Sequence, residues 1–262
     1  MFEGFFLPGE FLKHLGFVFS LLGYVGLSLF YFVEQDLWLS LAAWLGLLSV
    51  KVLIKPLRSQ VPLCLMIGLC FGLLDVLVRM GVLWPLDFCF VAIFGFVFSR
   101  FVVRRPVEKL KWSFAFSKLE VISILVINIP AIAILIWYYN THPEVSKMFP
   151  SVDFPIWSIP LLILGVAAVN GFREEIFYRG FVQPNSSLQS PAWFVVGLQA
   201  VLFGFLHFSN AFPQGWLGVF LTAIWGAAIA VQYQMFKSIS LAWVTHAVAD
   251  AIMFSIIIYT RS

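Results

Sequence analysis

The sequence predicts an all-α protein, a polytopic helical membrane bundle of about eight to nine transmembrane helices. Of the 262 residues, 61% are hydrophobic and only 11% are charged, whereas a soluble domain carries roughly 25% charged residues. The apolar residues form blocks of about 18 to 21 residues, each long enough to cross a hydrocarbon core of about 30 Å. A membrane β-barrel would instead show segments of about ten residues with alternating polarity. The lipid bilayer is therefore the expected solvent of this chain.

The candidate transmembrane spans have boundaries that are soft by several residues. They are Leu15–Val33, Leu37–Ile54, Val61–Val78, Leu86–Val103, Leu119–Tyr139, Ile156–Gln183, Ala192–Ser209, Trp216–Met235 and Ile239–Tyr259. The second span is the least secure because it contains Lys51, which we expect to extend from the helix end to the headgroups. We divide the chain into residues 1–150, transmembrane helices of unassigned role, and residues 151–262, a catalytic membrane domain.

Basic residues are concentrated in alternate loops, and this bias orients the predicted bundle. The loop after the second span and the loop from Arg100 to Lys118 are basic. The loop around Glu34 and the loop from Asn140 to Asp153 are acidic or nearly neutral. Because basic loops stay in the cytoplasm, we expect an integral multi-pass membrane protein with a cytoplasmic N-terminus. The expected location is a bacterial-type inner membrane.

Charge and cysteine usage exclude two further classes of function. The net charge is only +3, and no basic stripe follows an aromatic platform, so nucleic acid is not an expected partner. Cys64, Cys70 and Cys89 lie within apolar blocks and lack the spacing of metal ligands. They are interpreted as small buried hydrophobic residues.

Polar side chains within the apolar blocks are concentrated in the C-terminal half of the chain. They are Asn170, Arg173, Glu174, Glu175 and Arg179 in the sixth span, His207 in the seventh, and His246 and Asp250 in the ninth. A charged side chain at the bilayer centre costs about 2.5 to 3.5 kcal/mol on insertion scales, so each of these residues requires a partner or a task. The helical rise of about 1.5 Å per residue places them at similar depths. They are predicted to surround one buried site.

Helical geometry predicts different roles for the two adjacent glutamates. Glu175 and Arg179 are four residues apart, so they share a helix face and are expected to pair. Glu174 points about 100° away from Glu175 and is expected to stay free for chemistry. Arg173 is expected to anchor a cytoplasmic helix end. His246 lies one turn from Asp250.

A carboxylate and two imidazoles are able to activate water for peptide-bond hydrolysis. Glu174 would take the proton as general base, His207 would hold and polarise the water, and a further donor would stabilise the oxyanion. The same groups are also standard zinc ligands. Metal is the less favoured alternative because the sequence has no H-E-x-x-H helix. No G-x-S-x-G elbow supports a serine nucleophile.

Three ordered motifs resemble those of the CAAX protease and bacteriocin-processing (CPBP, also Abi) family. They are Glu174-Glu175-Ile-Phe-Tyr-Arg179, Phe203-Gly-Phe-Leu-His207 and His246-Ala-Val-Ala-Asp250. The family's pattern is E-E-x-x-x-R, F-x-x-x-H and H-x-x-x-N or D, on successive membrane helices of an all-α bundle. The resemblance covers roughly Ile156 to Tyr259 and leaves the first helices unassigned.

The resemblance implies a glutamic-type intramembrane endopeptidase that uses no cofactor. Glu174 would be the base, His207 would help to position the water, and His246 and Asp250 would form the oxyanion pair. Glu175 and Arg179 would support the site. An asparagine amide donates hydrogen bonds, whereas an ionised Asp250 only accepts them. Asp250 is therefore either protonated or orients His246.

The expected partner is a membrane-bound peptide or protein substrate, including lipid-modified ones. Two other function classes stay open. Intramembrane Glu, His and Asp also build proton relays, which would suit a proton-coupled transporter. The sequence shows no inverted repeat that would favour transport. A non-catalytic immunity or scaffold protein could keep the same fold.

Overall fold

The computed structural model describes residues 8–81, 86–98, 100, 111–142, 155–187, 190–208 and 212–259. The regular secondary structure in these ranges is helical, and their one β-type contact is an isolated bridge between Lys111 and Ser238. The predicted all-α class is confirmed. The helices are α1 (Pro8–Ser28), η1 (Leu29–Val33), α2 (Leu37–Leu53), η2 (Lys55–Gln60), α3 (Val61–Arg79), α4 (Leu86–Val97), α5 (Lys118–Thr141), η5 (Ile156–Ser158), α6 (Ile159–Phe177), η6 (Tyr178–Val182), α7 (Gln183–Ser187), α8 (Ala192–Leu206), α9 (Gly215–Phe236) and α10 (Ile239–Tyr259).

Local sequence signals explain several helix ends. The Asp36 side chain accepts hydrogen bonds from two backbone amides at the start of α2. Ser117 and Glu120 form a reciprocal capping box at the start of α5. Such bonds satisfy amides that have no partner within the helix. Lys237, with φ of 51°, ends α9 in the left-handed conformation, and α10 begins two residues later.

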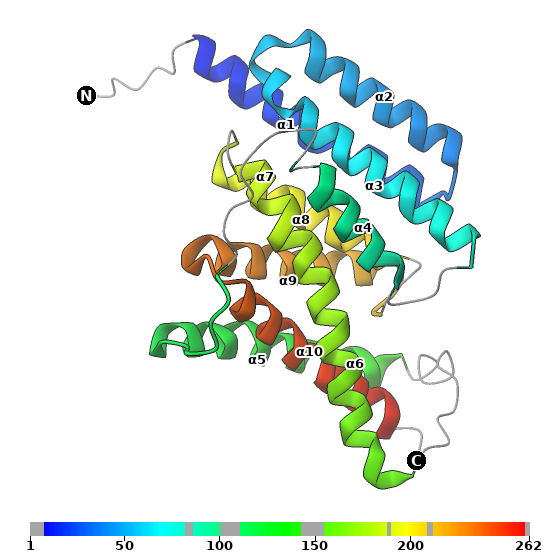
Figure 1. Cartoon of the computed structure of the whole chain (residues 1–262), viewed down its shortest axis with the longest axis vertical. Helices are drawn as coiled ribbons and strands as arrows, with labels where there is room; N and C mark the ends of the chain where they lie inside the picture. Colours follow the sequence, from blue (N-terminus) through cyan, green and yellow to red (C-terminus); the bar gives the residue numbers. More distant parts are fainter. Residues whose placement is uncertain are drawn as a thin grey trace.

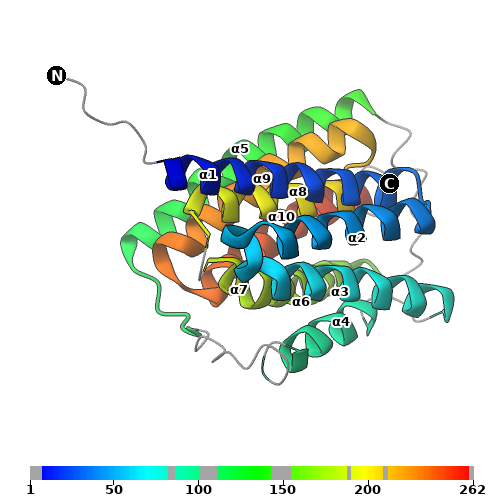
Figure 2. The ribbon, with the colours of Figure 1, turned by 90° about the horizontal axis from the view of Figure 1, so that it is seen from above.

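The helices form two groups joined by α6 and α8. Helices α1, α2 and α3 lie side by side in one group, and α5, α9 and α10 belong to the other (Figure 1). Helix α8 packs against both α1 and α9, and α10 packs against both α6 and α5. In the view from above, α4 and α5 lie at opposite edges of the molecule (Figure 2). Residues from α6, α8 and α10 therefore meet in the interior.

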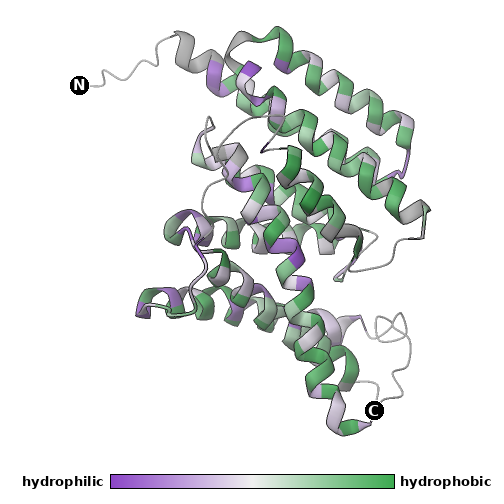
Figure 3. Ribbon diagram, in the orientation of Figure 1, coloured by the Kyte–Doolittle hydropathy of each residue, from purple (hydrophilic) through white to green (hydrophobic). Residues whose placement is uncertain are grey.

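Six helices in the described ranges are long and apolar enough to cross a membrane. They are Lys13–Val33, Leu57–Leu74, Lys118–Thr141, Ile156–Val182, Gly215–Phe236 and Ile239–Ile258. The apolar helices Leu37–Leu53 and Ala192–Leu206 are shorter. Hydrophobic residues cover most of the ribbon, and hydrophilic positions interrupt them partway along α6 and η6 (Figure 3). The chain is a helical membrane bundle, while eight or nine crossings stay a prediction.

Lys51 does not extend to the headgroups, so that expectation was wrong. The side chain is 0% exposed. Its ammonium group donates to the Ser20 hydroxyl at 3.0 Å and to the Gln60 side-chain oxygen. It also lies 5.2 Å from the centre of the Tyr24 ring and 6.0 Å from that of Phe194. Polar and aromatic partners inside the bundle take the place of headgroup water.

Other differences concern helix ends and cysteines. Helix α8 ends at Leu206, so His207 lies at its C-terminal end and not inside a span that continues to Ser209. Helix α4 runs to Val97, and Phe98 and Arg100 after it are π-helical, so the predicted end of this span at Val103 lies outside the described residues. Cys64 and Cys70 are free and buried, as predicted. The Cys89 side chain, most of the second basic loop and most of the loop before Pro155 lie outside what the structure describes.

Candidate active site

The close crossing of α6 and α10 brings together the motifs that these two helices carry. Gly171 lies at this crossing. A Cβ atom on Gly171 would lie 3.3 Å from the Ala247 backbone nitrogen and 3.4 Å from the His246 Cβ. A side chain here would press on the α10 backbone, and a neighbour would have to shift by a few tenths of an ångström. The next turn of α6, which carries Glu174 and Glu175, lies against His246.

Glu175 connects Arg179 and His246 through one carboxylate oxygen. Its Oε1 atom lies 2.9 Å from an Arg179 guanidinium nitrogen and 2.7 Å from His246 Nδ1. The predicted pair between Glu175 and Arg179 is present, and both side chains are 0% exposed. Because a carboxylate accepts hydrogen bonds, the hydrogen of His246 lies on Nδ1. The sequence did not reveal that Glu175 also orients this histidine.

The other ring nitrogen of His246 faces two more carboxylates. Nε2 lies 3.8 Å from Glu174 Oε2 and 3.7 Å from Asp250 Oδ2. Both separations exceed a direct hydrogen bond. The side chains of Glu174, His246 and Asp250 are between 3% and 10% exposed. Three carboxylates thus surround one buried imidazole. Glu175 bonds to Nδ1, and Nε2 is directed toward Glu174 and Asp250.

Arg173 and Asn170 complete the polar face of α6. An Arg173 guanidinium nitrogen lies 3.2 Å from Glu174 Oε1, and Arg173 Nε donates to Asn170 Oδ1 at 3.0 Å. Asn170 in turn donates to Asp250 Oδ2 at 2.8 Å. The expectation that Arg173 anchors a cytoplasmic helix end was wrong, since it is paired inside the bundle. Glu174 is not free of partners either.

Asn170 is a residue that the sequence placed in the buried polar set but to which it gave no role. The spacing of Asn170, Arg173 and Glu174 was the available signal, because residues three and four apart share a helix face. Asn170 brings an amide into contact with Asp250, close to where the family pattern allows an asparagine. The carboxylate of Asp250 is thus held by a hydrogen-bond donor from α6.

His207 enters the site from the end of α8. Its Nδ1 atom lies 3.0 Å from the Phe203 carbonyl oxygen. Since a carbonyl oxygen only accepts, the hydrogen lies on Nδ1, and Nε2 of the neutral ring is an acceptor. The His207 ring also lies against the Phe203 ring, and Phe203 contacts His246. Phe203 therefore positions both histidines.

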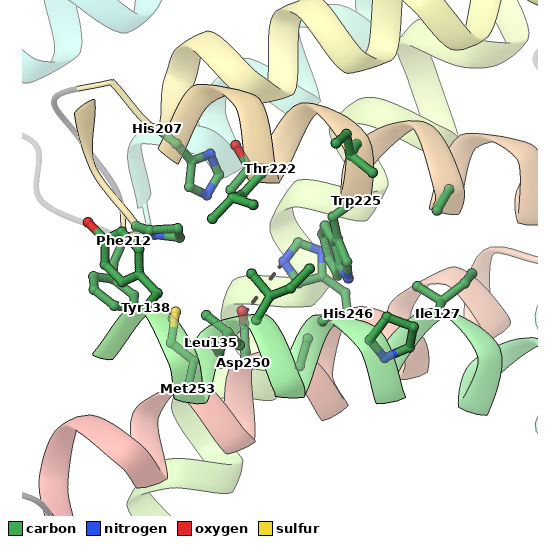
Figure 4. Close-up of a pocket in the computed structure, with 18 of the residues that line it drawn as sticks. Ile127, Leu135, Tyr138, His207, Phe212, Thr222, Trp225, His246, Asp250 and Met253 are labelled. Atoms are coloured by element: carbon green, nitrogen blue, oxygen red, sulfur yellow. Dashed lines mark ion pairs between the residues drawn. The ribbon is translucent and has the colours of Figure 1, made fainter. Parts of the chain in front are cut away.

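A cavity of about 330 Å³ adjoins these residues. His207, His246 and Asp250 line it, together with Tyr138, Phe212 and Trp225 (Figure 4). Most of the other lining side chains are apolar and come from α5, α9 and α10. Val126, Ile134 and Ile224 also line it and are 64%, 39% and 56% exposed, respectively. The cavity therefore reaches the apolar outer surface between α5 and α9.

The helix that carries the glutamates widens directly after them. Residues Tyr178–Val182 form the π-helical segment η6. Wide turns of this kind occur frequently at functional sites. The buried Arg179 side chain donates from η6 to the Gly226 carbonyl of α9 at 2.8 Å. A regular α-helical period does not predict this turn.

The arrangement of the acidic and imidazole groups bears on the zinc alternative. Within the described residues, no three His, Cys, Asp or Glu side chains are grouped so that they could hold a metal ion. Glu175 is bonded to Arg179, and His246 Nδ1 is bonded to Glu175. These bonds occupy groups that a metal would require. Metal-free chemistry stays a prediction.

One family of known proteins resembles the C-terminal part of the chain. Residues 156–252 match the family model described as Type II CAAX prenyl endopeptidase Rce1-like. No curated protein and no solved structure gives a match. The matched region runs from η5 through most of α10 and includes all three motifs. Over residues 156–252, this helical membrane protein is thus similar to the Rce1-like CAAX prenyl endopeptidases.

Proposed function

We propose that the chain is a glutamic-type intramembrane endopeptidase. It hydrolyses a peptide bond of a membrane-associated substrate with water that Glu174 and His207 activate. The observation that carries this proposal is the position of His246 Nε2, 3.8 Å from Glu174 and 3.7 Å from Asp250, beside a cavity that His207 also lines. The match of residues 156–252 to the Rce1-like family model supports the reaction class.

The proposed reaction begins with water between Glu174 and His207. The acceptor Nε2 of His207 orients one hydrogen of the water, and Glu174 takes a proton as the oxygen attacks the carbonyl carbon. The carbonyl oxygen becomes negative in the tetrahedral intermediate. Glu174 then returns the proton to the leaving amine as the C–N bond breaks. The products are a carboxylic acid and an amine, which become a carboxylate and an ammonium group when the remaining proton moves between them, and no other reactant is consumed.

The developing oxyanion lies beside His246 and Asp250 in this proposal. His246 donates from Nε2 when this nitrogen carries a hydrogen in addition to the one on Nδ1. Asp250 donates only in its protonated form. Glu175 is a positioning residue, because it holds His246 through Nδ1 and does not face the reacting atoms. Arg179 in turn holds Glu175.

The cavity suits a substrate with an apolar chain. Its lining is mostly apolar, and its rim residues on α5 and α9 are exposed. A substrate anchored in the bilayer would enter sideways from the lipid and place its peptide bond next to His246. Membrane-bound peptides, including lipid-modified ones, are the proposed substrate class. Zinc is not part of the proposal.

The test compares terminal proteomics of membranes that contain wild-type protein, Glu174→Gln or His207→Ala at matched abundance. Because a general base contributes about 10² to 10⁴ in rate, peptide ends made by the enzyme should fall by that range in Glu174→Gln. Glu120→Gln is the matched control, because Glu120 does not line the cavity and a glutamine at this position would still close the capping box of α5. Unchanged ends in both site variants would contradict the proposal and direct attention to ion-flux assays.

The orientation of the protein is a further part of the proposal. The loop charges favour a cytoplasmic N-terminus, and the proposed location is a bacterial-type inner membrane. The end of the bundle formed by η6, α7 and the start of α8 is then on the cytoplasmic side. Reporter fusions at the N-terminus and after residue 142 would test this, since a reporter at 142 should be external.

A further inference from the structure

A column of buried polar side chains continues from the candidate site toward α7. Arg179 donates to the carbonyl of Gly226 at 2.8 Å, and Gln183 donates to that of Ala230 at 2.7 Å. These two carbonyl groups are one turn apart on α9. Arg179 and Gln183 are 0% and 1% exposed. Their remaining polar atoms, Arg179 Nε and Gln183 Oε1, have no hydrogen-bond partner among the described residues.

Gln199 of α8 is buried without any partner in the described part of the chain. It is 0% exposed, and neither its amide nitrogen nor its oxygen makes a hydrogen bond there. Burying an unpaired amide costs about 1–3 kcal/mol. Glu175 Oε2, at the other end of the column, is likewise buried and unpaired within the described ranges. So many unpaired groups in one region require an explanation.

Packing places Gln199 at the level of Gln183. The Tyr178 hydroxyl lies 3.5 Å from the Leu202 carbonyl oxygen, so these two residues mark one level of η6 and α8. The two segments run in opposite directions, because α8 returns into the bundle after α7. Gln183, five residues after Tyr178, and Gln199, three residues before Leu202, therefore lie on the same side of that level. The contact of Gly226 with Phe203 gives the same register between α9 and α8.

The unpaired atoms form a complementary set. Arg179 Nε and Gln199 Nε2 donate, whereas Glu175 Oε2, Gln183 Oε1 and Gln199 Oε1 accept. Internal water typically makes about three hydrogen bonds to such otherwise unpaired groups. An apolar residue at position 199 would pack without this cost. The presence of glutamine at position 199 thus indicates bound water.

We propose that Gln199, Gln183 and Arg179 hold a line of internal water molecules that connects the Glu175–His246 pair with the α7 end of the bundle. This line supplies the water that peptide hydrolysis consumes, and so rests on the proposed function. The cavity is a poor alternative route, because it is mostly apolar and a membrane-anchored substrate fills it during turnover. Gln199 is a positioning residue for water.

X-ray radiolytic footprinting of the full-length protein tests the water line without substrate. Radiolysis produces hydroxyl radicals from bound as well as bulk water, and these oxidise adjacent aromatic rings. Tyr178 and Phe203, which are 3% and 1% exposed, flank the column. We expect both rings to be oxidised rapidly in the wild type and several-fold more slowly in Gln199→Leu. Gln234→Leu, which changes a more exposed glutamine of α9, should leave both rates unchanged.

Stability separates loss of water from loss of structure. Because Gln199 makes no hydrogen bond to protein in the described ranges, Gln199→Leu and the unbranched Gln199→Met should keep the fold and lose only the stability that the bound water supplies. Unfolding of both variants would show that Gln199 bonds to protein and would overturn the proposal. Slow oxidation of Tyr178 and Phe203 in the wild type would also overturn it.

Kinetics distinguish failure of the water line from failure of the protease assignment. With a cleaved substrate, Gln199→Leu should lower kcat and leave KM unchanged. If ring oxidation depends on Gln199 but the protein cleaves no substrate, the result contradicts the protease assignment and supports the bound water. Cleavage with the same kcat in Gln199→Leu would overturn the supply role.

Discussion

At the scale of single residues, the role of Asp250 depends on whether its side chain donates or accepts a hydrogen bond. It accepts from Asn170 at 2.8 Å and lies 3.7 Å from His246. If Asp250 donates to the oxyanion, Asp250→Leu should lower kcat by about 10² to 10³. Asp250→Asn should recover most of that loss, because an amide also donates. Equal losses in both variants, with unchanged Tm, would instead show that Asp250 acts as a carboxylate.

The Glu175–Arg179 pair lends itself to a double-mutant cycle. Both side chains are fully buried, so removing one partner leaves an uncompensated charge that costs about 3–5 kcal/mol. Glu175→Leu and Arg179→Met should each lower stability by that amount in denaturation measured in detergent. The double variant should be close to wild type in stability, yet inactive, because His246 has lost its Nδ1 partner. An active double variant would remove Glu175 from the positioning role.

Sequence spacing predicted which residues lie in the buried site, but not which of them form hydrogen bonds with one another. The pair Glu175 and Arg179 follows from helical periodicity within one segment. The bonds of His246 to Glu175 and of Asn170 to Asp250 depend on how α6 rotates against α10, which no local pattern encodes. The unpaired Gln199 was equally invisible, because a lone glutamine in an apolar block gives no sign of its burial.

At the scale of secondary-structure elements, Gly171 sets the separation of α6 and α10. A side chain there would meet Ala247 backbone at 3.3 Å. We expect Gly171→Val to force the helices apart, lengthen the bond between Glu175 and His246, and abolish cleavage. Gly165→Val on the same helix is the control, since nothing in the described ranges lies within 4 Å of its Cβ position. Equal activity of the two variants would contradict the role of this crossing.

Helix ends were predictable where they have local causes. The bounds of α10 agree with the predicted span, and α9 begins and ends within one residue of its prediction. The π-helical turn η6 and the early end of α8 at His207 were not predicted. Both depend on contacts with neighbouring helices, which override the regular 3.6-residue period.

At the scale of the whole molecule, the cavity between α5 and α9 makes a prediction about substrates. Ala131→Phe would place a ring in the cavity lining. We expect a lower kcat/KM for peptides with a long apolar anchor and little change for short peptides without one. Ala133→Phe, on the exposed side of α5, is the control. A uniform loss for both substrate classes would argue that the cavity does not bind the anchor.

Composition was sufficient to predict the fold class, because a chain with 61% hydrophobic residues in long blocks is compatible with few folds other than a helical membrane bundle. The number of crossings was harder to predict, since α2 and α8 are apolar but short. The division of the chain at residue 150 and its orientation also stay predictions. Hydropathy cannot distinguish a helix that faces lipid from one that is enclosed by other helices.

The burial of Lys51 has a consequence for biogenesis. A lysine that leaves the translocon in an isolated helix meets hydrocarbon with no carboxylate partner among the described residues. Ser20 of α1, which accepts from Lys51, has already been synthesised when α2 emerges. Insertion as a paired helical hairpin would therefore solvate the ammonium group, whereas sequential release of α1 and α2 would strand it. Pairing of α1 with α2 would then be a folding step that precedes completion of synthesis.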